Sequence, residues 1–239
     1  MTWHPREPRR YPSVVPNPVV LVHGFASSFQ HGWADDGWPD ILADEGLEVI
    51  GGDLPGHGSS PKPTDSAAYE NLEETVLATF SDRPQVDAVG FSLGSRILLT
   101  LATREPDRFG RLVLMGIGDN VFDEGQGDAL AEVLENGSTP ENIGMRVFDR
   151  MAAEPRNDRA ALAAVMRRRA PVLDEASLAR VSCPVLLVLG EQDFVGPAER
   201  LASALPISQL RIVTGVDHFA TPKTFEAIDA TVRFLKAER

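Results

Sequence analysis

Apolar runs of four to seven residues alternate along the chain with longer stretches in which apolar residues recur at helical spacing. The runs are typical of strands that are buried on both faces of a parallel sheet. Strands are predicted at 18–23, 47–52, 86–91, 111–116, 184–190 and 209–214. Helices are predicted at 38–45, 67–80, 93–104, 197–204 and 222–237. This alternation predicts a parallel sheet with helices on both of its faces.

A long segment at about 117–182 interrupts the alternation between the fourth and fifth predicted strands. Glycines and prolines divide it into helical patterns. Helices are predicted in it at 129–134, 143–152 and 159–169. We interpret the segment as a small lid or cap inserted into a single domain that takes in residues 1–239. Its only phenylalanines are Phe122 and Phe148, which favours small or medium apolar substrates.

The chemistry is indicated first by Gly90-Phe91-Ser92-Leu93-Gly94, which lies between a predicted strand and a predicted helix. A serine on such a sharp turn has strained backbone, and side chains two residues on either side would collide, so glycines are expected there. The N-terminus of the following helix points its free N–H groups toward developing negative charge. The pattern predicts Ser92 as a nucleophile, although the pattern alone would also fit a glycine-rich turn with an idle serine.

Two further polar residues follow predicted strands at the same edge of the sheet. Asp193 comes shortly after the fifth strand and His218 shortly after the sixth. The chain order of nucleophile, acid and base is that of a hydrolase triad. In this interpretation His218 accepts the proton of Ser92, and Asp193 orients the imidazole and stabilises its charged form. Asp119 also follows a strand, but its motif context is weaker than that of Asp193.

Four motifs together resemble those of the α/β-hydrolase superfamily, in particular its esterase-like members with a serine nucleophile. They are Val22-His23-Gly24-Phe25, Asp53-Leu54-Pro55-Gly56-His57-Gly58, the serine turn, and Gly190-Glu191-Gln192-Asp193 paired with Asp217-His218-Phe219. The resemblance implies the α/β-hydrolase fold, with the backbone N–H groups of Phe25 and Leu93 forming the oxyanion hole. Only 17 residues precede the first strand, and prolines among them predict that the family's N-terminal hairpin is shortened or absent.

Other polar and aromatic residues receive less specific interpretations. His23 and His57 are expected to make structural turn contacts, and Asp53 is expected to accept hydrogen bonds in a tight turn. Glu191 and Asp217 lie near the predicted triad in sequence but should point elsewhere. The substrate pocket is expected to be lined by Trp33, Phe122 and Phe148.

Composition limits the possible partners. The chain has 23 basic and 35 acidic residues, a net charge of −12, which argues against binding to nucleic acid or to an anionic membrane surface. The basic cluster Arg167–Arg169 is interpreted as a solvated helix face.

The single cysteine, Cys183, allows no intramolecular disulfide. No segment resembles a signal peptide or a membrane span, so a cytoplasmic protein is expected. No cluster has metal-ligand spacing, and neither a metal nor a cofactor is expected.

These observations favour a serine hydrolase that cleaves carboxylic esters, thioesters or lactones with a small or medium apolar acyl group. The substrate would be a small molecule that forms an acyl-enzyme on Ser92. Two alternatives remain open. The same triad could hydrolyse a carbon–carbon bond or carry out perhydrolysis, or the scaffold could serve a ligand-binding or signalling protein without catalysis.

Overall fold

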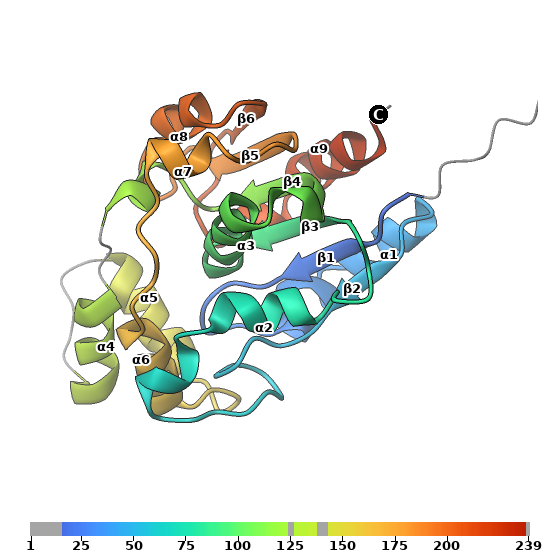
Figure 1. Cartoon of the computed structure of the whole chain (residues 1–239). Helices are drawn as coiled ribbons and strands as arrows, with labels where there is room; N and C mark the ends of the chain where they lie inside the picture. The colour runs from blue at the N-terminus through green and yellow to red at the C-terminus, as the bar shows by residue number, and fades with distance from the viewer. Residues whose placement is uncertain (1–15, 124–126, 138–142, 238–239) are drawn as a thin grey trace, which may run out of the picture.

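The computed structural model describes residues 16–123, 127–137 and 143–237. In this part of the chain, six strands form one parallel sheet in the order β2-β1-β3-β4-β5-β6 (Figure 1). The strands are β1 Val19–Val22, β2 Val49–Gly51, β3 Val86–Phe91, β4 Phe109–Met115, β5 Val185–Gly190 and β6 Ser208–Val213. Each predicted strand and the parallel α/β architecture are therefore confirmed. The prediction about the N-terminal hairpin concerns residues outside the described ranges.

Helices cover both faces of the sheet, as the alternation predicted. They are α1 Trp38–Asp44, α2 Leu72–Ala78, α3 Leu93–Arg104, α8 Glu199–Ala204 and α9 Phe225–Lys236. Side chains of α1 and α9 share one core with Val19 and Leu21 of β1. Side chains of α2, α3 and α8 share the other core with Val20 and Val22, because successive residues of a strand point to opposite faces. The helix predicted at 67–80 is divided into a 3₁₀ helix, Ser66–Tyr69, and α2.

The sheet changes its winding direction between β1 and β3. The chain runs from β1 outward to the edge strand β2 and then returns to β3 on the other side of β1. At such a switch point, the loops leaving the carboxyl ends of the two neighbouring strands diverge and leave a crevice, where ligands of α/β proteins bind. The loops that follow Val22 and Phe91 leave the sheet at this place.

Most of the insertion between β4 and β5 forms a group of helices beyond the carboxyl edge of the sheet (Figure 1). It contains a 3₁₀ helix, Asp119–Phe122, followed by α4 Gly127–Asn136, α5 Ile143–Ala152, α6 Arg159–Arg167 and α7 Glu175–Leu178. The three helices predicted in this segment correspond to α4, α5 and α6. Among the described residues, no helix combines the length and the apolar character that crossing a membrane would require.

A buried ion pair ties α2 to the end of α6. Arg168 Nη1 donates to Glu73 Oε1 over 2.9 Å, and both side chains are only 3% exposed. The interpretation of Arg167–Arg169 as a solvated face was therefore wrong for Arg168, because α6 ends against α2 and turns this side chain inward. Its neighbour Arg167 does form surface ion pairs, mainly with Glu135.

We predict that the Glu73→Leu variant is destabilised by about 3–5 kcal/mol, since it leaves the Arg168 guanidinium buried without a counter-charge. Urea denaturation monitored by circular dichroism measures the change. The double variant Glu73→Leu/Arg168→Met should recover most of the loss. Glu74→Leu is the matched control, because Glu74 is exposed and its contact with Arg104 is 3.7 Å long. Equal losses at positions 73 and 74 would contradict the prediction.

Candidate active site

Ser92 occupies the turn between β3 and α3 in a backbone conformation that residues with a side chain rarely adopt, with φ 51° and ψ −111°. A Cβ atom on Gly94 would lie 2.1 Å from the carbonyl oxygen of Val22, and one on Gly90 would lie 2.6 Å from the amide nitrogen of Ser95. These distances confirm the steric reason for the two glycines. They also show that α3 begins in direct contact with the end of β1.

Phe25 and Leu93, the residues whose amides were expected to form the oxyanion hole, both line the cavity beside Ser92. Leu93 is the first residue of α3, so its N–H has no acceptor within the helix, and Phe25 lies in the loop that follows β1. Neither amide donates a hydrogen bond to a described residue. Ala26, next to Phe25, has φ 55°, and it shares a positive φ with Ser92 alone among the described non-glycine residues. One residue with strained backbone therefore adjoins each of the two amides, as is common at functional sites.

The imidazole of His218 is held by Asp193. Its Nδ1 lies 2.9 Å from each carboxylate oxygen of Asp193, and the two side chains are 1% and 0% exposed. The carboxylate also accepts a hydrogen bond from the backbone N–H of Val195. His218 Nε2 is buried and has no hydrogen-bond partner among the described residues. It is therefore not bonded to Ser92 in this structure, although such contacts are often long in an unliganded site.

The other acidic residues near the site accept hydrogen bonds from backbone N–H groups and not from His218. Asp119 Oδ1 accepts from the backbone N–H of Leu201 in α8 at 2.8 Å. Glu191 accepts from the N–H of Gly215, and Asp217 accepts from the N–H of Ala220. The carboxylate that contacts His218 is thus that of Asp193, as the sequence predicted.

His23 makes the structural contact predicted for it and connects two loops. Its Nε2 accepts from the backbone N–H of Leu54 at 3.0 Å, so its Nδ1 carries the proton and donates to the carbonyl of Gly24 at 2.8 Å. Burial lowers the pKa of His23, which keeps the ring neutral. Asp53, as expected, accepts hydrogen bonds from Phe29 and Ser59. Although burial opposes them, these bonds keep the pKa of Asp53 below its usual value.

His57 is buried beside the loop of Phe25 and is also neutral. Its Nδ1 lies 3.0 Å from the carbonyl oxygen of Pro55, and its ring centre lies 5.7 Å from that of Phe25. Burial, together with the proximity of His23, lowers the pKa of His57 to about 3. The role is structural, as the sequence indicated.

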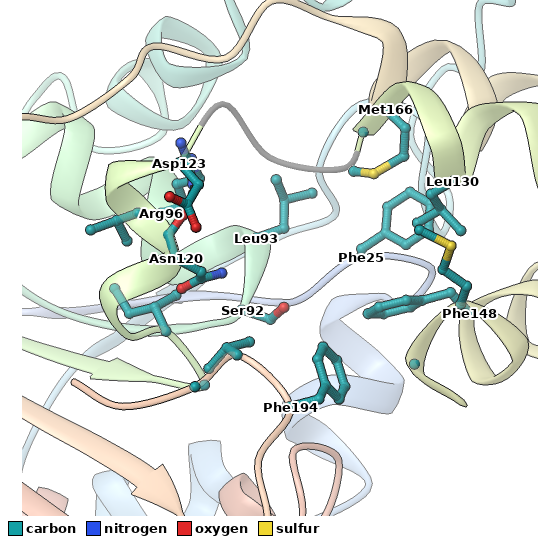
Figure 2. A pocket seen from close by; sticks show the side chains of 18 residues that line it. Phe25, Ser92, Leu93, Arg96, Asn120, Asp123, Leu130, Phe148, Met166 and Phe194 are labelled. Atoms are coloured by element: carbon teal, nitrogen blue, oxygen red, sulfur yellow. The ribbon is translucent and has the colours of Figure 1, made fainter. Parts of the chain in front are cut away.

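A cavity of about 660 Å³ opens above Ser92 and has one polar end and one apolar end. Figure 2 shows Arg96, Asn120 and Asp123 at one end and Phe25, Leu130, Phe148 and Met166 at the other, with Ser92 and Leu93 between them. The polar end was not expected from the sequence.

Of the three aromatic residues predicted to line the pocket, the structure brings only Phe148 to the cavity. Trp33 is fully buried on the other side of the sheet, where it packs against Trp38. Phe122 lies outside the lining, and its ring is covered by the guanidinium of Arg200 at 3.8 Å. Both predictions were wrong because proximity in sequence to a functional loop does not determine which face a side chain takes.

Sequence reasoning missed three residues of the site. Phe194 lines the cavity and its ring centre lies 4.4 Å from that of His218. Its position directly after Asp193 was a usable signal. Arg96 follows Ser92 by one helical turn, a spacing that places both on one helix face. Asn157, in the insertion, donates from Nδ2 to the carbonyl of Ala26 at 3.0 Å, a contact that no local pattern indicates.

The buried neutral histidines predict how stability depends on pH. The folded-state pKa of His57, about 3, is below the value of about 6.5 for an unfolded chain. The unfolded state therefore binds more protons below pH 6.5, and stability falls as the pH is lowered. At pH 5 the loss from His57 should be about 2 kcal/mol relative to pH 8. Urea denaturation of His57→Asn at both pH values should show a flatter dependence, and substitution of the exposed His31 by Asn should not. An unchanged dependence in His57→Asn would refute this assignment.

Among the described residues, no group of three or more histidine, cysteine or acidic side chains is placed to hold a metal ion. The site is thus a serine on a strained turn, two free amides and a buried imidazole–carboxylate pair, all at the carboxyl edge of a parallel sheet.

Comparison with known proteins identifies relatives that are esterases and hydrolases. The pimeloyl-(acyl-carrier protein) methyl ester esterase of Neisseria meningitidis serogroup B is 30% identical, and the match covers 95% of each chain. A 2-hydroxy-6-oxononadienedioate/2-hydroxy-6-oxononatrienedioate hydrolase of Escherichia coli is 33% identical over 42% of this chain, and the chain spans only 36% of that protein. The solved structure of 2-hydroxy-6-oxo-6-phenylhexa-2,4-dienoate hydrolase from Rhodococcus sp. strain RHA1 shares the fold, with a TM-score of 0.67, 22% identity, and 92% and 90% of the two chains covered. The model of the alpha/beta hydrolase family matches residues 19–228, and the chain therefore belongs to this family.

Proposed function

We propose that this hydrolase cleaves carboxylic esters through an acyl-enzyme formed on Ser92, with His218 as the general base and acid and Asp193 as the residue that orients it. The observation that carries the proposal is the buried Asp193–His218 pair, whose Nε2 has no partner among the described residues and whose ring centre lies 4.9 Å from that of Phe91, the residue before Ser92. The similarity along nearly the whole chain to a methyl ester esterase supports ester cleavage.

The proposed reaction begins with attack of Ser92 Oγ on the ester carbonyl carbon, while the hydroxyl proton passes to Nε2 of His218. The negative charge on the carbonyl oxygen is stabilised by the N–H groups of Phe25 and Leu93, which have no other acceptor among the described residues. The bond to the leaving oxygen then breaks, and His218 returns the proton to the departing alcohol. Water repeats the sequence on the acyl-enzyme and releases the carboxylic acid.

Asp193 determines which nitrogen of the imidazole is free. Because both of its oxygens lie 2.9 Å from Nδ1, the proton of a neutral His218 belongs on Nδ1, and Nε2 is left as the acceptor. The carboxylate also stabilises the imidazolium that forms when Ser92 loses its proton.

The insertion at about 117–182 is proposed to be the lid of this site. It supplies Leu130, Met145, Phe148 and Met166 to the cavity wall, opposite Ser92 of the sheet domain. A volume of about 660 Å³ is within the range of small-molecule pockets, about 300–1,000 Å³. This size fits a small or medium acyl group with an apolar body.

A second candidate is hydrolysis of a carbon–carbon bond by the same residues. The similarity to a 2-hydroxy-6-oxononadienedioate hydrolase favours it, although that match covers 42% of this chain. Turnover of p-nitrophenyl esters would support the ester reaction. Turnover of an oxo-dienedioate with no turnover of esters would favour the second candidate.

Ser92→Ala should lower the rate of ester hydrolysis by several orders of magnitude, about 10⁶-fold if the three residues act as a unit. The variant should remain folded, because the Ser92 side chain caps no helix and makes no hydrogen bond with a described residue. The rate is measured with p-nitrophenyl esters, and labelling with a fluorophosphonate is measured by intact mass. Labelling of Ser92→Ala equal to that of the unmodified protein would place the nucleophile elsewhere.

Asp193→Asn should lower turnover by about 10⁴-fold and leave the fold intact, because the amide stabilises the wrong tautomer of His218. Asp119→Asn is the matched control, since Asp119 also follows a strand but bonds to the N–H of Leu201. It should affect stability more than turnover. The reverse ranking of the two variants in the same assay would assign the orienting role to Asp119.

A further inference from the structure

The cavity contains a guanidinium that has no carboxylate partner among the described residues. Arg96 lines the cavity and forms no ion pair with a described residue. Its Nη1 and Nη2 reach only the carbonyl oxygens of Asn120 and Pro171, at 3.5 and 3.4 Å. Its Nε is buried and has no hydrogen-bond partner in the described part of the chain. A guanidinium has five N–H donors in a planar fork, and most of those of Arg96 find no acceptor in the described part of the chain.

The charges around Arg96 do not neutralise it. The charge of Arg168, which is buried, acts on Arg96, and Glu73 is already bonded to Arg168 at 2.9 Å. Asp123 lies at the same end of the cavity (Figure 2), but it is exposed and lies beyond ion-pair distance from Arg96. Burial and the charge of Arg168 lower the pKa of Arg96, and the attraction of Glu73 and Asp123 offsets this only in part. An arginine nevertheless remains protonated in proteins.

The position of Arg96 relative to Ser92 tells which part of a substrate it would meet. Its backbone N–H donates to the carbonyl of Ser92 at 3.0 Å, so the two residues are one helical turn apart, with Cβ atoms about 5–6 Å from each other. The leaving alcohol must lie near His218, whose ring contacts Phe194 at 4.4 Å. Figure 2 places Arg96 and Phe194 in different parts of the cavity, with Ser92 between them. The acyl group would therefore extend toward Arg96.

We propose that Arg96 forms an anion subsite for a second carboxylate at the far end of the acyl group, so that the preferred substrates are monoesters of dicarboxylic acids. This inference rests on the proposed function and names its substrate class. A carboxylate matches the guanidinium fork and can accept two of its N–H groups at once. The expectation of an acyl group that is apolar throughout is replaced by one with an apolar body and an anionic end.

The test compares kcat/KM for p-nitrophenyl monoesters of adipate and suberate with that for the corresponding ω-amides, which have the same shape and no charge. The unmodified protein should prefer the carboxylates by about 10- to 100-fold, as expected for a hydrogen-bonded charge in a buried site. Arg96→Met should lose this preference, because kcat/KM should fall much further for the carboxylates than for the amides. Arg96→Lys should keep part of the preference, because it retains the charge but not the fork.

Two variants serve as controls. Arg180→Met removes an exposed arginine that does not line the cavity and should leave both rates unchanged. Asp123→Asn removes the carboxylate that would repel the substrate, and it should raise kcat/KM for the carboxylates only. Equal rates for carboxylate and amide in the unmodified protein, or a similar loss on both substrates in Arg96→Met, would overturn the proposal.

A failure of the proposed function would be seen separately, as absence of turnover of every ester together with absence of fluorophosphonate labelling. The subsite is then tested by binding alone. Adipate should raise the melting temperature of the unmodified protein more than hexanoate does, and Arg96→Met should abolish the difference. No difference between adipate and hexanoate in the unmodified protein would refute the subsite irrespective of catalysis.

Discussion

The contact between the start of α3 and the end of β1 is the constraint on which the site depends. A Cβ atom at position 94 would lie 2.1 Å from the carbonyl oxygen of Val22, so only glycine allows the helix to begin so close to the strand. The approach brings the amide of Leu93 beside the loop that continues β1 through His23 to Phe25. It also leaves Ser92 with φ 51°, so its side chain projects from the turn instead of joining the helix. Close packing and a serine side chain that projects from the turn are thus two consequences of one contact.

The loops around this contact are held by neutral, buried histidines. His23 accepts from Leu54 and donates to Gly24, so it joins the loop after β1 to the loop after β2. A charged imidazole could not accept the first of these bonds, and burial lowers the pKa of His23, which disfavours the charged form. Asn157 adds a third support, from the insertion, through the carbonyl of Ala26. The free amide of Phe25 is therefore positioned by residues from three separate segments.

Much of this arrangement could be predicted from the sequence, since it depends on local patterns. Short apolar runs identified each strand of the described sheet, and the glycines around Ser92 identified the turn for a steric reason that the structure confirms. The contact of His218 with Asp193 followed from the rule that carboxyl ends of parallel strands meet at one edge. The errors concern side chains whose surroundings are set by distant segments. Trp33 turns toward α1, and Arg168 meets Glu73, which lies 95 positions away.

Arg96 illustrates why the polar end of the cavity was hidden from sequence reasoning. Its spacing from Ser92 places it on the right helix face, but a helix residue of this type is ordinarily solvated or paired. Only the fold shows that Glu73, one of the acids near Arg96, is bonded to Arg168 instead. Removing a guanidinium from water without a counter-ion destabilises the folded chain. A carboxylate ligand would offset that cost, so binding there would couple recognition of the acyl group to the stability of the helix that begins at Ser92.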